Sequence, residues 1–153
     1  MAAGYLKHAF DPKLTRRVAL ETCKVMQYVD ADIVVVRGLS GSLIASAMST
    51  LFGIPFAVVR KPGETSHSLA AIEIAGDWPR YDNWIIVDDF IATGHTVEEI
   101  GRAVKERKND FGEIQGRCVG IVLYGSRRRK YENWDINGKQ VQIYPIDVGD
   151  DED

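Results

Sequence analysis

Short runs of β-branched and other apolar residues recur along the chain and predict strands. Four of them are almost continuous rather than alternating, which is typical of strands covered on both faces in a parallel sheet. They lie at residues 32–36, 56–60, 84–87 and 117–125, and the segment 69–74 is a further candidate strand.

Segments with helical periodicity separate these runs. Asp11 and Pro12 offer an N-cap and a first helical residue for a helix that ends near Val29. A second helix is predicted over residues 42–53, and a third over residues 96–108, where Thr96 and Glu99 have the spacing of a capping box. Strands that alternate with helices predict an α/β fold: a mostly parallel, Rossmann-like sheet flanked by helices.

The C-terminal part carries a strong hairpin signal. Asn137-Gly138, between two runs of strand-forming residues, is typical of a type I′ turn. We therefore expect a single domain over residues 1–153, with a core at about 12–125 and a small hood or hairpin at about 126–147. The last residues, 148–153, read as an acidic solvated tail.

Composition narrows the class of protein. With 153 residues, 45% hydrophobic and 27% charged, the chain fits one globular domain, and no apolar run reaches the ~20 residues of a membrane span. We expect a cytoplasmic protein without a membrane segment, because the N-terminus has no signal-peptide pattern.

Cys23 and Cys118 belong to no CxxC pair. The net charge of -3 makes nucleic acid an improbable partner, and we interpret the basic cluster at 127–130 as solvated surface.

The candidate chemistry follows the predicted strands, at residues 37–41, 61–68 and 88–96. Ligands of parallel sheets bind beyond the carboxyl ends of the strands, so these segments are candidates for one site. Asp88 and Asp89 are hydrogen-bond acceptors that suit sugar hydroxyls or metal-bound water. The turn after them opens a helix, whose N-terminus favours an anion. A ligand with a sugar diol and a phosphate would satisfy both parts, whereas the simpler interpretation is a solvated strand end before a capped helix.

The stretch IIVDDFIATGHT at residues 85–96 resembles the phosphoribosyl pyrophosphate (PRPP) signature of the type I phosphoribosyltransferases. Asp88, Asp89, Thr93, Gly94 and Thr96 all match it, whereas Phe90 is bulkier than the usual aliphatic residue. The segments VVVRGLSGS and RKPGETSHS are similar to the family's pyrophosphate loop and mobile catalytic loop, in the same order along the chain.

The resemblance implies roles for these segments. Asp88 and Asp89 would hold the ribose hydroxyls, directly or through Mg²⁺ and its waters. The 5′-phosphate would lie on the turn formed by Ala92, Thr93, Gly94, His95 and Thr96. The pyrophosphate would be bound by Arg37, Gly38, Leu39, Ser40 and Gly41, and the catalytic lid would carry Arg60, Lys61 and His67. His95 occupies the position that the signature leaves free, so it inherits no role of its own.

The implied activity is Mg²⁺-dependent transfer of the phosphoribosyl group of PRPP to a nucleobase, by a homodimer. A non-catalytic PRPP or nucleotide sensor and a generic phosphate-binding domain are the alternatives. Ala92 stands where relatives that act on 6-oxopurines typically have an aspartate, and RKPGE is more similar to the adenine enzymes. Residues 61–84 are shorter than in typical adenine enzymes, so an adenine-like purine is only slightly favoured. Tyr124 and Trp134 are candidates for the base pocket.

Overall fold

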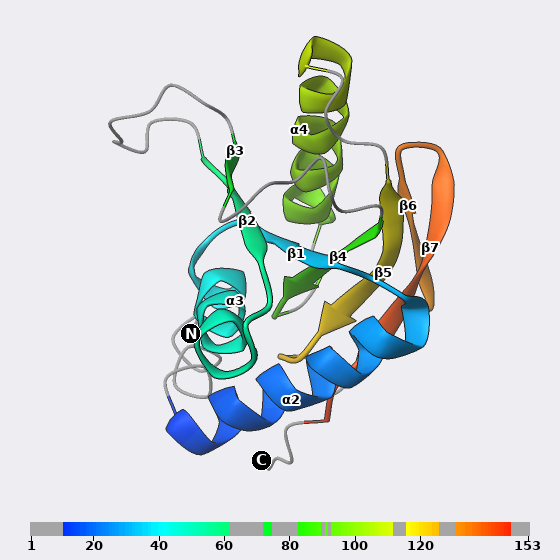
Figure 1. The fold of residues 1–153 in the computed structure, drawn as a ribbon. Helices are drawn as coiled ribbons and strands as arrows, with labels where there is room; N and C mark the ends of the chain where they lie inside the picture. Colours follow the sequence, from blue (N-terminus) through cyan, green and yellow to red (C-terminus); the bar gives the residue numbers. More distant parts are fainter. Residues whose placement is uncertain are drawn as a thin grey trace.

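A seven-stranded, mostly parallel sheet forms the centre of the computed structural model (Figure 1). The structure describes residues 11–61, 72–74, 83–89, 91, 93–111, 116–125 and 131–147. His67, Ala92, the basic cluster at 127–130 and the acidic tail at 148–153 lie outside these residues.

The strand order is β3-β2-β1-β4-β5-β7-β6. Five strands run parallel: β1 (Ile33–Val36), β2 (Phe56–Val59), β4 (Asn83–Asp88), β5 (Arg117–Leu123) and β7 (Lys139–Pro145). The short β3 (Ile72–Ile74) and β6 (Asn133–Ile136) pair antiparallel at the two edges. The predicted fold class is confirmed. Of the candidate strand at 69–74, residues 72–74 form β3, and residues 69–71 lie outside the described residues.

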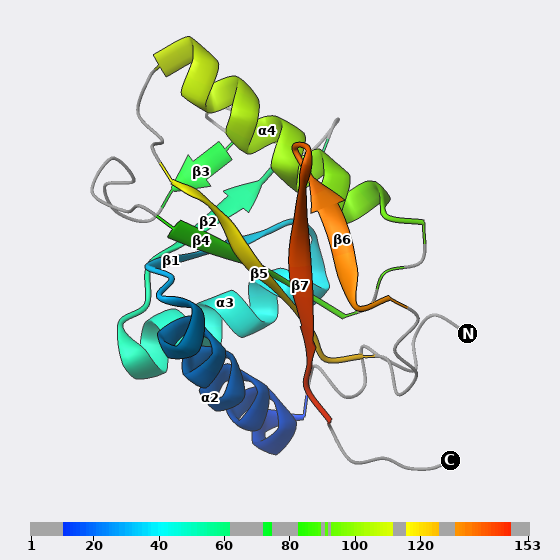
Figure 2. The ribbon, with the colours of Figure 1, turned by 90° about the vertical axis from the view of Figure 1, so that its right-hand side faces the viewer.

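Helices cover both faces of the sheet. Figure 2 shows α2 (Pro12–Val29) and α3 (Leu39–Phe52) on one side and α4 (His95–Phe111) on the other. Successive residues of a strand point to opposite faces, so Val34 and Val36 pack towards α2 and α3 while Ile33 and Val35 pack towards α4. Both layers are buried, which explains why these strands are apolar without alternation.

One of the three described helices starts where the sequence predicts, and the other two start at different residues. Asp11 accepts a hydrogen bond from the Lys13 N–H at 2.9 Å and caps α2, as expected. α3 begins at Leu39, three residues before the predicted start. α4 begins at His95, so Thr96 is inside the helix and the predicted capping box is wrong; the Glu99 carboxylate pairs with Arg102 instead.

The C-terminal hairpin forms as predicted but belongs to the main sheet. Asn137 and Gly138 have φ values of 53° and 86°, the positive values that a type I′ turn requires. β7 pairs in parallel with β5, so the hairpin extends the core sheet instead of standing apart as a hood. The Asn137 side-chain amide donates to the Gly101 carbonyl of α4 at 2.9 Å, which fixes the hairpin against that helix.

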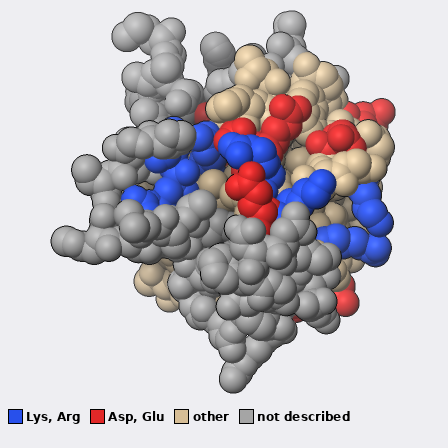
Figure 3. All heavy atoms as spheres, turned by 90° about the horizontal axis from the view of Figure 1, so that it is seen from above, with Lys and Arg blue, Asp and Glu red and all other residues tan. Residues whose placement is uncertain are grey.

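The described surface carries charges of both signs. On the face shown in Figure 3, basic and acidic side chains lie interspersed, so the described residues form no uniformly basic area there.

Within the described residues, no helix combines the length and apolar composition that a membrane crossing requires. Cys23 and Cys118 are free thiols in the structure.

Candidate functional site

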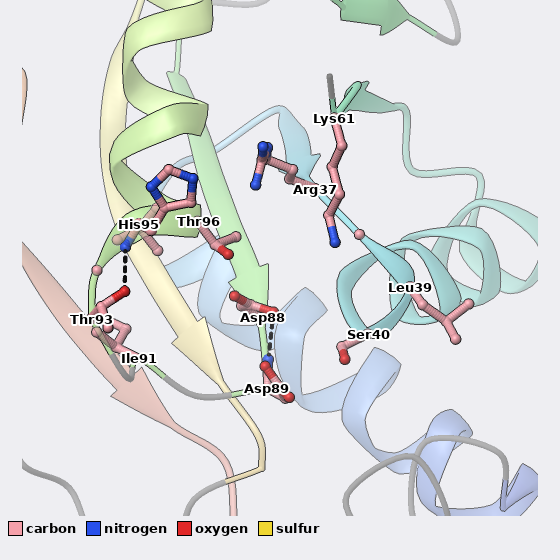
Figure 4. A pocket seen from close by; sticks show the side chains of 13 residues that line it. Arg37, Leu39, Ser40, Lys61, Asp88, Asp89, Ile91, Thr93, His95 and Thr96 are labelled. Carbon is pink, nitrogen blue, oxygen red and sulfur yellow. Dashed lines mark hydrogen bonds between the residues drawn. The ribbon is translucent and has the colours of Figure 1, made fainter. Parts of the chain in front are cut away.

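A pocket opens where the chain leaves β1 and β4 in opposite directions. These strands are parallel neighbours, β1 continues to β2 on one side, and β4 is followed by β5 on the other. Such a point leaves a crevice beyond the carboxyl ends of the strands. The pocket has a volume of about 290 Å³ (Figure 4). The residues that line it come from three separate segments: Arg37, Gly38, Leu39, Ser40, Lys61, Asp88, Asp89, Ile91, Thr93, Gly94, His95, Thr96 and Val97.

Two buried carboxylates form the acidic part of the pocket. Asp88 and Asp89 are each 7% exposed, and the Asp89 N–H donates to the Asp88 carboxylate at 2.9 Å. Burial raises the pKa of Asp88 to about 8, and the neighbouring charge of Asp89 adds to this, while the positive charge of Lys61 opposes it. Figure 4 shows Asp88 directed towards Thr96 and Asp89 towards Ser40. Neighbouring residues of a strand point to opposite faces, so the two side chains leave the backbone in different directions. Both nevertheless line the same pocket.

The start of α4 supplies amide donors beside this pair. Gly94 has a φ of 87°, a conformation that favours glycine, and the Thr93 hydroxyl accepts a hydrogen bond from the His95 N–H at 3.2 Å. The Gly94 carbonyl accepts from Glu98 N–H and closes the first helical turn. Thr93, Gly94, His95 and Thr96 therefore place the N-terminal end of a 17-residue helix, with its partial positive charge, at the pocket.

The start of α3 supplies a second set of donors. Gly38 has a φ of 90°, and its carbonyl accepts hydrogen bonds from both the N–H and the hydroxyl of Ser42. A Cβ on Gly41 would lie 2.6 Å from the Val87 carbonyl oxygen and 2.9 Å from the Val36 Cβ. Only glycine at this position lets the helix start rest directly on β1 and β4.

Basic side chains reach the pocket from two elements. Arg37 is 8% exposed, and no hydrogen bond or ion pair joins its guanidinium to another described residue. Figure 4 shows it directed into the pocket. Lys61, after β2, places its ammonium group beside Gly38, 3.3 Å from where a Cβ would stand. Arg60 does not line the pocket, so its catalytic role stays a prediction.

Neither base-pocket candidate lines the pocket, but each contacts a residue that does: Tyr124 contacts Ser40, and Trp134 lies against Gly94. Tyr124 is 2% exposed and packs in the core on the side of α2 and α3, and a role in base binding stays a prediction. Strand alternation explains this packing, since Tyr124 shares a face with Val122. Trp134 is partly buried against Gly94 and Tyr131, and a role in base binding stays a prediction.

Two apolar residues complete the lining. Ile91 and Val97 are 8% and 1% exposed and also belong to the core beneath α4. Their side chains carry no chemical signal in the sequence, which is why they are absent from the expected site. Their position on the turn around Gly94 is the only feature that could have indicated them.

Comparison with known proteins decides the family. The sequence model described as the phosphoribosyl transferase domain matches residues 26–153. The chain belongs to the phosphoribosyl transferase family. A hypoxanthine/guanine phosphoribosyltransferase from a Methanocaldococcus species is 30% identical over 92% of this chain and 74% of the relative. An adenine phosphoribosyltransferase from Thermotoga neapolitana is 28% identical over 82% of this chain and 80% of the relative.

Solved structures agree on the fold of this phosphoribosyl transferase domain. An orotate phosphoribosyltransferase from Mycobacterium tuberculosis superposes with a TM-score of 0.59 at 19% identity, covering 76% of this chain and 63% of the other. An adenine phosphoribosyltransferase from Thermoanaerobacter pseudethanolicus gives 0.56 at 18% identity, covering 92% and 82%. The resemblance of residues 85–96 to the type I phosphoribosyltransferases is thus confirmed, and the enzyme class is that of the pentosyltransferases.

Proposed function

We propose that this protein transfers the 5-phosphoribosyl group of PRPP to a purine base, with release of pyrophosphate and with Mg²⁺ as the metal. One observation carries the proposal. A single pocket combines two buried carboxylates with two helix N-termini and two basic side chains. PRPP has the matching groups, because its ribose hydroxyls lie between a 5′-phosphate and a pyrophosphate.

Each part of the pocket has a task in this reaction. The bond between the sugar C1 and the pyrophosphate oxygen breaks, its electron pair leaves with the pyrophosphate, and a base nitrogen bonds to C1 as the base gives up a proton to solvent. The sugar centre gains oxocarbenium character, as in glycoside chemistry. Arg37, Lys61 and the start of α3 offset the charge that builds on the pyrophosphate, while the start of α4 holds the 5′-phosphate.

The donor set of the pocket fits Mg²⁺. Asp88 and Asp89 are hard oxygen donors, and both are buried at the pocket. Within the described residues no group of three or more acidic, histidine or cysteine side chains is present to form a complete protein cage. Mg²⁺ usually binds through one or two carboxylates, with waters and substrate phosphates as the other ligands. When bound, the ion would screen the charges of the diphosphate and of the carboxylates.

An adenine-like purine is the acceptor that we favour. Ala92 does not supply the carboxylate that relatives acting on 6-oxopurines typically place before the threonine. The two relatives named from the sequence comparison are an adenine and a hypoxanthine/guanine phosphoribosyltransferase, which supports a purine as the acceptor class. The homodimer and the cytoplasmic location stay predictions.

The experiment compares PRPP binding with pyrophosphate release in matched variants. Wild type should bind PRPP with Mg²⁺ by calorimetry and release pyrophosphate when a base from the panel adenine, guanine, hypoxanthine, xanthine, uracil and orotate is added. The double variant Asp88→Asn with Asp89→Asn should lose binding, and Lys61→Ala should keep binding but lose most release.

Two exposed residues on the C-terminal hairpin provide controls with the same chemical changes: Asp135→Asn and Lys139→Ala should behave as wild type. Binding without release for every base would support the sensor, and absence of PRPP binding would overturn both functions.

A further inference from the structure

Tyr124 touches both the acidic part of the pocket and the start of α3. It follows β5, whose last residues pair in register with β4 up to Asp88 and Leu123. The Tyr124 N–H donates to the Asp88 carbonyl at 3.2 Å, and the next N–H, of Gly125, donates to the Asp89 carbonyl at 2.6 Å. The backbone of the acidic pair is therefore held by the end of β5.

The side chain of the same tyrosine reaches the other part of the pocket. Its hydroxyl donates to the Ser40 carbonyl at 2.8 Å, across 84 positions of sequence, and the residue is 2% exposed. A buried hydroxyl needs a partner, and this one uses a backbone carbonyl in the first turn of α3. Phenylalanine would fill the same volume, so the oxygen serves the hydrogen bond rather than the packing.

That hydrogen bond restrains a peptide group that matters for anion binding. The Ser40 carbonyl and the Gly41 N–H belong to one planar trans peptide, so fixing the carbonyl also fixes the direction of the N–H. The Gly41 N–H is in the first turn, where an α-helix offers no acceptor of its own. Ser40 lines the pocket, so the restrained turn is the one that faces the ligand.

We infer that Tyr124 is a positioning residue that holds the first turn of α3, and with it the pyrophosphate-binding donors, at a fixed place relative to Asp88 and Asp89. The inference rests on the proposed function, since it assumes that the start of α3 binds pyrophosphate. On this inference, the Tyr124 hydroxyl affects binding of the pyrophosphate and leaves binding of the 5′-phosphate unchanged. The hydrogen bonds of Tyr124 that carry the inference join it to Asp88 and to Ser40, in the first turn of α3, whereas the 5′-phosphate is assigned to the start of α4.

The test compares Tyr124→Phe with a matched control. Thr22→Val also removes a buried hydroxyl that donates to a backbone carbonyl, that of Val18 at 2.7 Å, but it does so within α2, away from the pocket lining. Binding of pyrophosphate with Mg²⁺ and of ribose 5-phosphate is titrated separately, well below the melting temperature of each variant. Hydrogen exchange at residues 40–42 provides a second readout that needs no ligand.

Tyr124→Phe should bind pyrophosphate about three to ten times more weakly, the effect of one neutral hydrogen bond, and bind ribose 5-phosphate as wild type does. Exchange at 40–42 should be faster than in Thr22→Val, whose binding of both ligands should be unchanged. Equal binding of pyrophosphate by Tyr124→Phe and wild type, or equal weakening for both ligands, would overturn the positioning role alone. If wild type bound neither ligand, the proposed function would fail and the positioning role with it.

Discussion

Trp134 lies directly against Gly94, at the turn that opens α4. A Cβ placed on Gly94 would overlap the indole ring, and Gly94 has a φ of 87°. The ring also packs edge-on against Tyr131, with the centroids 4.7 Å apart. The C-terminal hairpin therefore supports the turn whose amides face the pocket, although the hairpin itself lies at the edge of the sheet.

We predict that Gly94→Ala destabilises the protein and impairs binding at the start of α4. Positive φ and overlap with the ring should together cost roughly 2–4 kcal/mol of unfolding free energy, measured in urea. Adding Trp134→Leu should recover part of this loss, because the smaller side chain makes room for the methyl group.

The single variant Trp134→Leu should weaken ribose 5-phosphate binding more than pyrophosphate binding. Equal stability losses in Gly94→Ala with and without Trp134→Leu would show that the ring does not constrain this position.

A second prediction concerns the pH dependence of stability. The pKa of Asp88 in the folded protein is raised to about 8 by burial, from an ordinary value of 3.8. The folded state therefore holds this proton more tightly than the unfolded state. Protonated Asp88 therefore adds to the free energy of unfolding. This contribution is complete below about pH 4 and is lost as the pH rises through about 8.

Asp88→Asn should remove this dependence, because asparagine stays neutral. Without Mg²⁺ or PRPP the variant should be more stable than wild type above pH 7, by on the order of 1–3 kcal/mol, and should match it near pH 4. Thermal unfolding from pH 4 to pH 9 measures the difference, with Asp135→Asn, an exposed aspartate on β6, as the control. A variant less stable than wild type at pH 8 would contradict the account of this carboxylate.

The third prediction concerns Arg37. The buried guanidinium has no hydrogen-bonding partner among the residues that the structure describes; such a charge is unfavourable in the free protein, and a bound anion removes that cost. Arg37→Gln should leave the melting temperature unchanged or raise it, while pyrophosphate binding falls roughly 10- to 100-fold. Arg117→Gln, on the exposed start of β5, should change neither quantity. A large loss of stability in Arg37→Gln with intact pyrophosphate affinity would make this residue structural.

Gly41 provides a prediction about packing alone. Gly41→Ala forces a methyl group against the Val87 carbonyl and the Val36 side chain, which should cost about 1–3 kcal/mol of unfolding free energy. Ser46→Ala, on the exposed side of the same helix, should be neutral or slightly stabilising. Unfolding in urea distinguishes the two, and an unchanged midpoint for Gly41→Ala would mean that α3 can move away from the sheet at little cost.

Local pattern and one rule for parallel sheets predict much of this molecule. The apolar run at Ile33–Val36 is buried on both faces, as its lack of alternation indicates. The rule that ligands bind beyond the carboxyl ends of strands brings Arg37, Lys61 and Asp88 into one pocket, although 51 positions separate the first from the last (88 minus 37).

Features that depend on contacts between distant segments are not predictable in this way. The partner of the Tyr124 hydroxyl is a backbone carbonyl 84 positions away, which no residue type at position 40 would reveal. The pairing of β7 with β5 is likewise non-local, so the hairpin signal at Asn137 could not show that the hairpin extends the sheet. The start of α3 at Leu39 depends on Gly41 fitting against β1 and β4, which is a matter of tertiary packing.

Identification of the reaction product tests the central claim most directly. Purified wild-type protein is incubated with PRPP, Mg²⁺ and each base of the panel, and the mixture is analysed by mass spectrometry for the nucleoside 5′-monophosphate. The proposed function predicts a monophosphate from a purine, with adenine as the best acceptor, and one pyrophosphate for each product molecule. Folded protein that binds PRPP but forms no nucleotide from any base would contradict it.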